Sequence, residues 1–129
     1  MDGMQSIDLT DAEWSVMECL WERSPLTARE AAAALERKTG WKRSTTLTLL
    51  RRLEQKGAVS YTGEGKNHLY APRIRREDAC RRETRALLDR LYDGSVSLMV
   101  STLTQKQPLS RAEIDALYAL LKQAEEGEQ

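Results

Sequence analysis

The stretch from Lys42 to Gly57 constrains this chain most, because its residues divide into two faces at the spacing of an α-helix. At about 100° per residue, one side carries three leucines and a threonine, namely Thr46, Leu49, Leu50 and Leu53. The opposite side is polar and carries Ser44, Thr45, Thr48, Arg51, Arg52 and Gln55. Gly57 is typical of a helix end, where glycine adopts the left-handed conformation. The pattern predicts one buried and one exposed face.

The polar face suits the major groove of DNA. Small hydroxyls allow close approach, whereas arginine and glutamine reach base edges and phosphates. Helix geometry and charge add two basic residues at the helix start. The candidate DNA contacts in this stretch are Lys42, Arg43, Ser44, Thr45, Thr48, Arg51, Arg52 and Gln55. The alternative is that Thr45 and Thr48 are ordinary threonines of a helix surface.

The formal net charge is zero, but the charges are unevenly distributed. Residues 1–36 hold two basic and eight acidic residues, a balance of −6. Residues 37–76 hold eleven basic and two acidic residues, a balance of +9, and residues 77–129 hold seven and ten, a balance of −3. One basic band in a neutral chain indicates a local contact with a polyanion. The alternative is a solvated surface on which charges happen to cluster.

Two shorter helices are predicted before this stretch. Thr10–Glu13 and Thr27–Glu30 both have the spacing of a capping box, in which the threonine and glutamate side chains each accept a backbone N–H bond. They predict helices over about 11–23 and 28–38, separated by Pro25.

After Gly57 the hydrophobic period changes to two. Residues 58–62 and 68–71 alternate like strands, and residues 63–67 are rich in turn formers, so a β-hairpin is predicted. Three helices followed by a hairpin form a winged helix-turn-helix, whose third helix enters the major groove. Lys66 and His68 on this wing are candidate phosphate contacts, although a lone surface histidine often has no special role.

The remaining chain is predicted to be helical, so the expected fold class is mostly α with a small β-hairpin. The expected domains are a winged-helix DNA-binding domain over residues 1–72 and a helical dimerisation region over residues 73–129. The apolar stripes of the later helices supply the candidate dimerisation residues Leu87, Leu91, Val96, Met99, Val100, Leu103, Ile114, Leu117 and Leu121. These helices could fold back on the first domain. A second copy is favoured, because a two-fold dimer reads two DNA half-sites.

The chain is expected to be cytoplasmic. No apolar run approaches the roughly 18 residues that a membrane span needs, and the N-terminus lacks the order of a signal peptide. Residues 1–8 are expected to be disordered. Cys19 and Cys80 match no metal-binding spacing and are expected to be reduced structural thiols, with a redox role as the alternative.

An enzyme is not expected. The chain has one histidine, no glycine-rich phosphate loop and no cluster of metal ligands at a recognised spacing. No catalytic residue, metal or cofactor is therefore predicted. The alternative to a DNA-binding repressor is a winged-helix protein-interaction module, since a fold alone does not settle function. The basic band argues against that alternative.

The chain resembles the penicillinase-repressor family, the BlaI/MecI/CopY group of bacterial transcriptional repressors. The resemblance extends in order over most of the sequence, in segments at residues 9–14, 16–17, 20–21, 28–30, 44–53, 56–57, 70–72, 87–92 and 109–114. It implies an N-terminal winged helix, a C-terminal dimerisation region, and a homodimer that binds a palindromic DNA operator. Thr45, Thr48 and Arg52 match the hydroxyl and arginine positions of the family's recognition helix.

Three departures from the family pattern matter. Leu47 stands where many members carry Arg or Lys, and is a candidate contact with a thymine methyl in a different operator. Staphylococcal members are cleaved at an Asn–Phe bond when a membrane sensor system responds. Ser101 and Thr102 stand at the matching positions, so they are the candidate proteolysis site, and a protease linked to a membrane sensor is a candidate partner. The C-terminal cysteine pairs of copper-sensing members are absent, which excludes copper control by that device.

Overall fold

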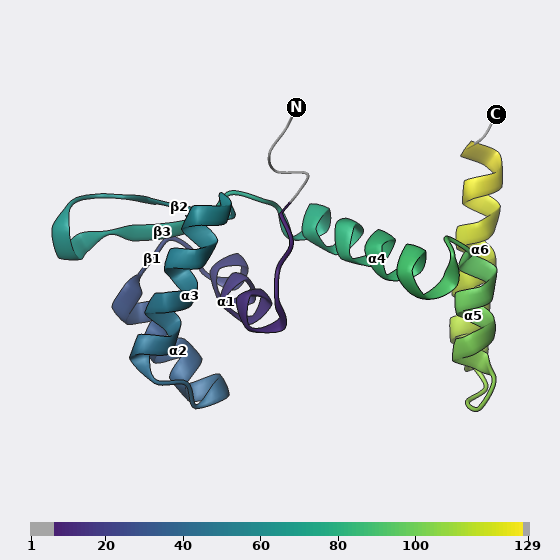
Figure 1. Cartoon of the computed structure of the whole chain (residues 1–129). Coiled ribbons are helices and arrows are strands. Elements are labelled where there is room, and N and C mark those ends of the chain that lie inside the picture. The colour runs from purple at the N-terminus through teal and green to yellow at the C-terminus, as the bar shows by residue number, and fades with distance from the viewer. Residues whose placement is uncertain (1–6, 128–129) are drawn as a thin grey trace. The chain divides into compact units, whose positions relative to one another are not determined.

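The computed structural model describes residues 7–127, apart from the side chain of Lys66. Its elements are α1 (Asp11–Glu22), β1 (Leu26–Thr27), α2 (Ala28–Thr39), α3 (Arg43–Lys56), β2 (Val59–Thr62), the 3-10 helix η2 (Gly65–Asn67), β3 (Leu69–Pro72), α4 (Arg76–Tyr92), α5 (Val96–Thr104) and α6 (Arg111–Gly127), as Figure 1 shows. The chain divides into an N-terminal unit, which ends at Arg81, and a C-terminal unit, which starts at Arg82.

The N-terminal unit packs α1, α2 and α3 against one another and beside a three-stranded antiparallel sheet. The strand order is β1-β3-β2, so β3 is central and pairs Tyr70 with Leu26 on one side and with Tyr61 on the other. Beyond the helices, β2 and β3 extend as a hairpin (Figure 1). This arrangement confirms the predicted winged-helix fold, including the hairpin. The two-residue strand β1 is not predicted, because it is too short to show a hydrophobic period.

One face of each helix forms the core of this unit. The predicted apolar face of α3 is confirmed, because Thr46, Leu49, Leu50 and Leu53 are all buried. The three leucines pack with Val16, Met17 and Leu20 of α1, Ala31 and Leu35 of α2, and Val59 of β2. Ile7 also belongs to this core at 8% exposure. The expectation of a disordered tip over residues 1–8 is therefore wrong at Ile7, because an apolar side chain gains more from burial there than the chain loses in entropy. Residues 1–6 lie outside the described part.

Local chemistry sets the helix ends as the sequence predicts. Thr10 Oγ1 accepts a bond from the Glu13 backbone N–H at 3.1 Å, and Thr27 does the same for Glu30 at 3.1 Å, so both capping boxes are confirmed. Gly57 ends α3 with a left-handed φ of 84°. That conformation is strained for any residue with a Cβ, which explains why glycine stands there.

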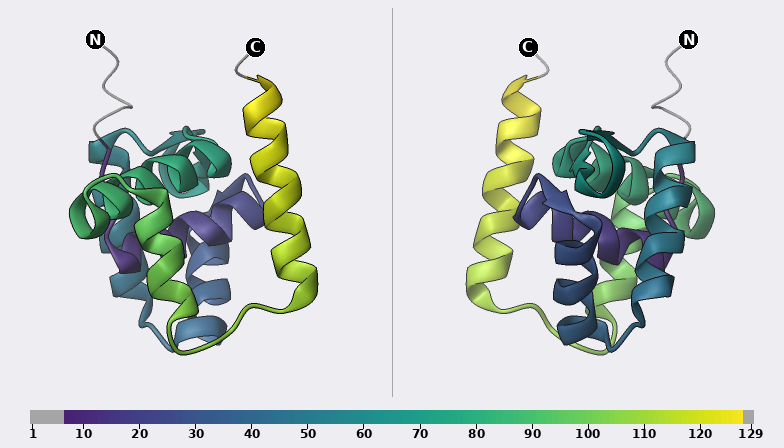
Figure 2. Two further views of the ribbon diagram at one scale, coloured as in Figure 1. Left: turned by 90° about the vertical axis from the view of Figure 1, so that its right-hand side faces the viewer. Right: turned by 90° about the vertical axis from the view of Figure 1, so that its left-hand side faces the viewer.

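The C-terminal unit has far less internal burial. Leu88 of α4 is buried at 3% exposure, whereas no residue of α5 or α6 is buried. Figure 2 shows α5 and α6 as separate helices joined by a loop. The predicted stripe of α5 exists, but Val96 and Leu103 on it are 54% and 60% exposed. Among residues 7–127, no helix is long and apolar enough to cross a membrane.

Candidate nucleic-acid interface

The polar face of α3 is presented to solvent. Its candidate DNA contacts are all exposed, and they comprise Arg43, Ser44, Thr45, Thr48, Arg51, Arg52 and Gln55, together with Lys42 at the N-cap. Leu47 is half-buried on the flank of this face. Leu50 and Leu53 on the opposite face are 1% and 0% exposed, so this face of the helix packs against the core. The two faces separate as the periodicity predicts.

The wing carries an aromatic cluster that is not among the sequence-based predictions. The ring of His68 stacks on Tyr61 with a centroid separation of 4.0 Å, and Tyr61 lies 5.7 Å from Tyr70. The available signal is the period of two, which places Tyr61 opposite Tyr70 on one face of the hairpin. His68 is half-buried by this stacking rather than projecting freely. Lys66 lies in η2, and its side chain is outside the described part of the structure.

Three cations of the basic band form ion pairs inside the N-terminal unit, and one of these pairs, Arg75 with Glu77 at 3.2 Å, is exposed. Arg76 forms a bidentate pair with Glu18, with Nε–Oε1 at 2.8 Å and Nη2–Oε2 at 3.1 Å. The hydrogen bond from Arg76 lowers the pKa of Glu18, against a smaller opposing effect of burial. Lys56 pairs with Glu13 at 2.6 Å. The band's balance of +9 therefore overstates the charge that this unit offers to a polyanion.

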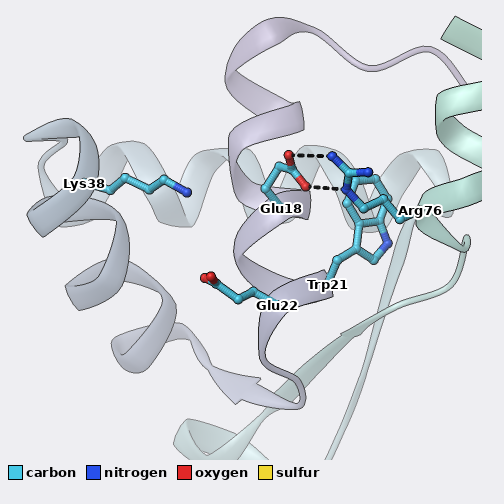
Figure 3. Close-up of a pocket in the computed structure, with 5 residues that line it drawn as sticks. All are labelled: Glu18, Trp21, Glu22, Lys38 and Arg76. Carbon is cyan, nitrogen blue, oxygen red and sulfur yellow. Dashed lines mark hydrogen bonds and ion pairs between the residues drawn. The ribbon is translucent and has the colours of Figure 1, made fainter. Parts of the chain in front are cut away.

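The Arg76 pair lines a surface pocket of about 250 Å³, together with Trp21, Glu22 and Lys38 (Figure 3). In Figure 3, Lys38 reaches from α2 toward α1, and Arg76 lies beside Trp21. The indole Nε1 of Trp21 donates to the backbone oxygen of Ile74 at 2.9 Å, which ties α1 to the start of α4. The lining of this pocket is therefore one ion pair, two further charged side chains and an indole.

The two thiols stand apart from any metal-binding arrangement. Cys19 is buried and burial raises the pKa of its thiol, which disfavours the reactive thiolate. Cys80 is half-buried, with its Sγ 3.6 Å from a guanidinium nitrogen of Arg76. Across the described range 7–127, no group of three or more His, Cys, Asp or Glu side chains could hold a metal ion.

The candidate dimerisation residues line open helix faces. Leu87, Leu91, Val96, Leu103 and Leu121 are exposed, whereas Met99, Val100, Ile114 and Leu117 are half-buried. The candidate proteolysis residues Ser101 and Thr102 are both exposed on α5, and Thr102 Oγ1 donates to the Leu98 backbone oxygen at 3.2 Å. Leu88 is the buried leucine of α4, whereas its neighbour Leu87, the predicted dimerisation residue, is 38% exposed.

A winged helix with an exposed polar third helix is typical of DNA-binding proteins. Comparison with known proteins identifies the family. A family model described as "Penicillinase repressor" matches residues 9–123. The chain is 32% identical to the penicillinase repressor of Bacillus licheniformis over 115 residues, covering 89% of this chain and 90% of that one. It is 24% identical to the methicillin resistance regulatory protein MecI of Staphylococcus aureus over 117 residues, covering 91% and 95%. The chain belongs to the penicillinase repressor family, as its motifs predict.

Solved structures also match the N-terminal unit. The DNA-binding domain of the repressor BlaI has a TM-score of 0.51 and 33% identity, covering 60% of this chain and 93% of that chain. The monomeric form of Bacillus licheniformis BlaI in complex with the blaP half-operator has a TM-score of 0.50 and 33% identity, covering 56% and 88%. Both similarities agree with the winged-helix fold.

Proposed function

We propose that this chain is a sequence-specific DNA-binding repressor of transcription that acts as a homodimer on a palindromic operator. The observation that carries the proposal is α3, whose arginines and hydroxyls are exposed while its leucines are buried. The family supports the proposal, since its member BlaI has been solved with a half-operator. Occupying a promoter requires no bond to be made or broken, so no catalytic residue or cofactor is proposed. Because its DNA partner lies in the bacterial cytoplasm, the proposed location of the chain is also the cytoplasm.

In this proposal α3 lies in the major groove. Thr45, Thr48 and Arg52 reach base edges, and Leu47 meets a thymine methyl. The other polar residues of the α3 face, with Lys66 and His68 of the wing, contact phosphates, which supply much of the affinity but little of the specificity. The alternative of a protein-interaction module is disfavoured, because it would not need cationic and hydroxyl side chains along one exposed helix face.

Dimerisation through the C-terminal helices is supported by their exposed apolar side chains. Leu103 and Leu121 are 60% and 63% exposed, and Tyr118 is 70% exposed. Several large apolar side chains exposed on two helices are typical of an interaction site. A second copy of the chain, with the same exposed apolar side chains, would bury them in a symmetric contact. A two-fold axis then presents one α3 to each half-site.

The proposal is tested by binding of the full chain to the DNA upstream of its own gene across a range of salt concentrations. We expect log affinity to fall steeply with log salt, and a shuffled duplex to bind far more weakly. Equal affinity for both duplexes, or a slope near zero, would contradict the proposal.

Thr48→Ala is expected to lose roughly 1–3 kcal/mol of discrimination at one base pair, because a direct contact to a base edge disappears. The ranking of single-base operator variants measures this loss. Thr84→Ala on the exposed surface of α4 is the matched control and should leave the ranking unchanged. If Thr48→Ala also leaves it unchanged, Thr48 is a surface threonine without a role in recognition.

Release by proteolysis is proposed at the Ser101–Thr102 bond. Cutting α5 there separates α6 from the rest of the chain, and so removes part of the apolar surface that the dimer needs. Co-expression with a membrane sensor encoded beside its gene, followed by mass measurement of the fragments, tests this. Fragments that end elsewhere would contradict the assignment.

A further inference from the structure

Lys56 occupies the last turn of α3, yet the protein itself holds its ammonium group. The Nζ atom lies 2.6 Å from Glu13 Oε1 on α1 and donates to the backbone oxygen of Asp8 at 2.7 Å. The Glu13 side chain is 1% exposed and that of Lys56 is 35% exposed. The ammonium group of Lys56 therefore contacts an almost fully buried carboxylate.

Glu13 is ionised in this pair. Burial alone would raise the pKa of its carboxyl, but the hydrogen bonds from Lys56 and from the Thr10 backbone, with the charge of Lys56, lower the pKa below its usual value. The same Oε1 accepts the Thr10 backbone N–H at 2.9 Å as part of the capping box. One buried oxygen therefore connects the start of α1 to the end of α3.

The second capping box of the chain is an internal comparison. Glu30 and Thr27 at the start of α2 form the same two bonds, at 2.9 Å and 3.1 Å. Glu30 is nevertheless exposed. Capping a helix thus requires neither the burial of Glu13 nor its contact with Lys56, so these two features serve something else.

The hydrogen bond between Lys56 and Glu13 is directional, whereas the other contacts between α3 and the core are not. The buried face of α3 is made of leucines, whose apolar packing is non-directional. Thr46 on the same face has a buried hydroxyl without a hydrogen-bond partner. A charge-assisted hydrogen bond at the C-terminal turn restricts how α3 rotates about its own axis. That rotation decides which side chains of α3 face a DNA groove.

We propose that Lys56 is a positioning residue for DNA recognition, which acts through its ion pair with Glu13 to set the orientation of α3 and makes no phosphate contact. The inference rests on the proposed function. It distinguishes Lys56 from the exposed cations of α3, such as Arg51 and Arg52, although all of them belong to the same basic band.

The test measures affinity of the full chain for its own upstream DNA and for a shuffled duplex, as a function of salt. In Lys56→Met and in Glu13→Gln, we expect specific affinity to fall about tenfold, the equivalent of one misplaced base contact. Affinity for the shuffled duplex should stay within about twofold, and the salt slope should not change. A phosphate contact by Lys56 would instead weaken both duplexes and reduce the slope by about 1.8 in a dimer, which would overturn the inference.

Three further variants separate positioning from stability. Glu30→Gln makes the same change at the exposed capping box, where it removes the charge and keeps the bond from Thr27. It should leave the ratio of specific to shuffled affinity unchanged, and an equal drop there would overturn the inference. Lys56→Met leaves a buried carboxylate unpaired and should lower the melting temperature, whereas Lys56→Met with Glu13→Gln should recover it. The ratio should stay low in this double variant. Lys56→Arg keeps the charge and should retain most of the ratio.

The outcomes also separate this inference from the proposed function. A wild-type chain that does not discriminate between the duplexes overturns both. A wild-type chain that discriminates, with Lys56→Met and Glu13→Gln keeping its ratio, overturns the inference alone. If the ratio returns together with the melting temperature in the double variant, the pair is merely stabilising. If Lys56→Met does not fold, Glu13→Gln still decides the question, because it keeps the size of the side chain and its bond from Thr10.

Discussion

Helices α3 and α6 both carry an apolar stripe, but the two stripes meet different surroundings. On α3, Leu50 and Leu53 are 1% and 0% exposed. On α6, Tyr118 and Leu121 are 70% and 63% exposed, and no residue of that helix is buried. Similar helical spacing has therefore led to a closed core in the N-terminal unit and to an open apolar face in the C-terminal unit.

This contrast indicates where each unit obtains its stability. The N-terminal unit buries leucines of three helices against one another, so its free energy of folding is internal to one chain. Exposed leucines contribute little until something covers them, because the hydrophobic effect scales with the area removed from water. The stability of the C-terminal helices is thus expected to depend on protein concentration, and that of the N-terminal unit is not.

The largest effect is expected when the closed core is opened. Leu50→Ala should lower the free energy of unfolding by about 2–5 kcal/mol, from lost burial and the cavity that remains. Urea denaturation measures it, and the loss should not vary with protein concentration. Leu121→Ala is the counterpart on the open face, and should cost much less at concentrations where the chain is monomeric. Similar losses at both positions would contradict the comparison.

A charge on the open face should break the assembly. Leu121→Glu is expected to weaken self-association by about 100-fold, because a desolvated carboxylate would replace an apolar side chain at the proposed two-fold contact. Sedimentation velocity measures this change, and the melting of the N-terminal unit should stay the same. Lys122→Glu places a carboxylate one residue later, with a larger change in net charge, and serves as the control. Unchanged association in Leu121→Glu would show that another surface mediates dimerisation.

Acid should affect the two units differently. The pKa of Glu13 is lower in the folded state than its ordinary value of 4.5. The ion pair therefore stabilises the folded chain fully above pH 4.5, and this contribution is lost as the pH falls through the folded-state pKa. Glu13→Gln should therefore be less stable at neutral pH and show a flatter acid limb in thermal melts. The pair of Arg111 and Asp115 on α6 is exposed, so Asp115→Asn should change the acid limb little. Parallel acid limbs in wild type and Glu13→Gln would refute the role of the pair.

The smallest effect concerns the one polar side chain on the buried face of α3. Thr46 is 0% exposed and its hydroxyl has no hydrogen-bond partner. Thr46→Val should stabilise the chain by about 1 kcal/mol, because an unsatisfied buried hydroxyl is replaced by a methyl group of similar size. Thr84→Val on the exposed surface of α4 is the control and should be close to neutral. Destabilisation by Thr46→Val would show that the hydroxyl is hydrogen-bonded in solution.

Much of the fold and the identity of the candidate interface can be predicted from local patterns. The two faces of α3, both capping boxes and the hairpin follow from spacing of a few residues, since helix and strand periods depend on the backbone alone. The family resemblance likewise lies in the order of short motifs. For the same reason the exposed polar set on α3 is recognisable from the amino-acid sequence.

The sequence alone sets the character of each surface, whereas packing of the folded chain selects which surfaces meet. The strand β1 and the burial of Ile7 both depend on neighbours that are remote in the chain. The pair of Lys56 and Glu13 joins residues 43 positions apart, and it turns one cation of the basic band into an internal contact. Charge can be counted along a sequence, but whether a charge faces solvent or a buried partner depends on packing in three dimensions.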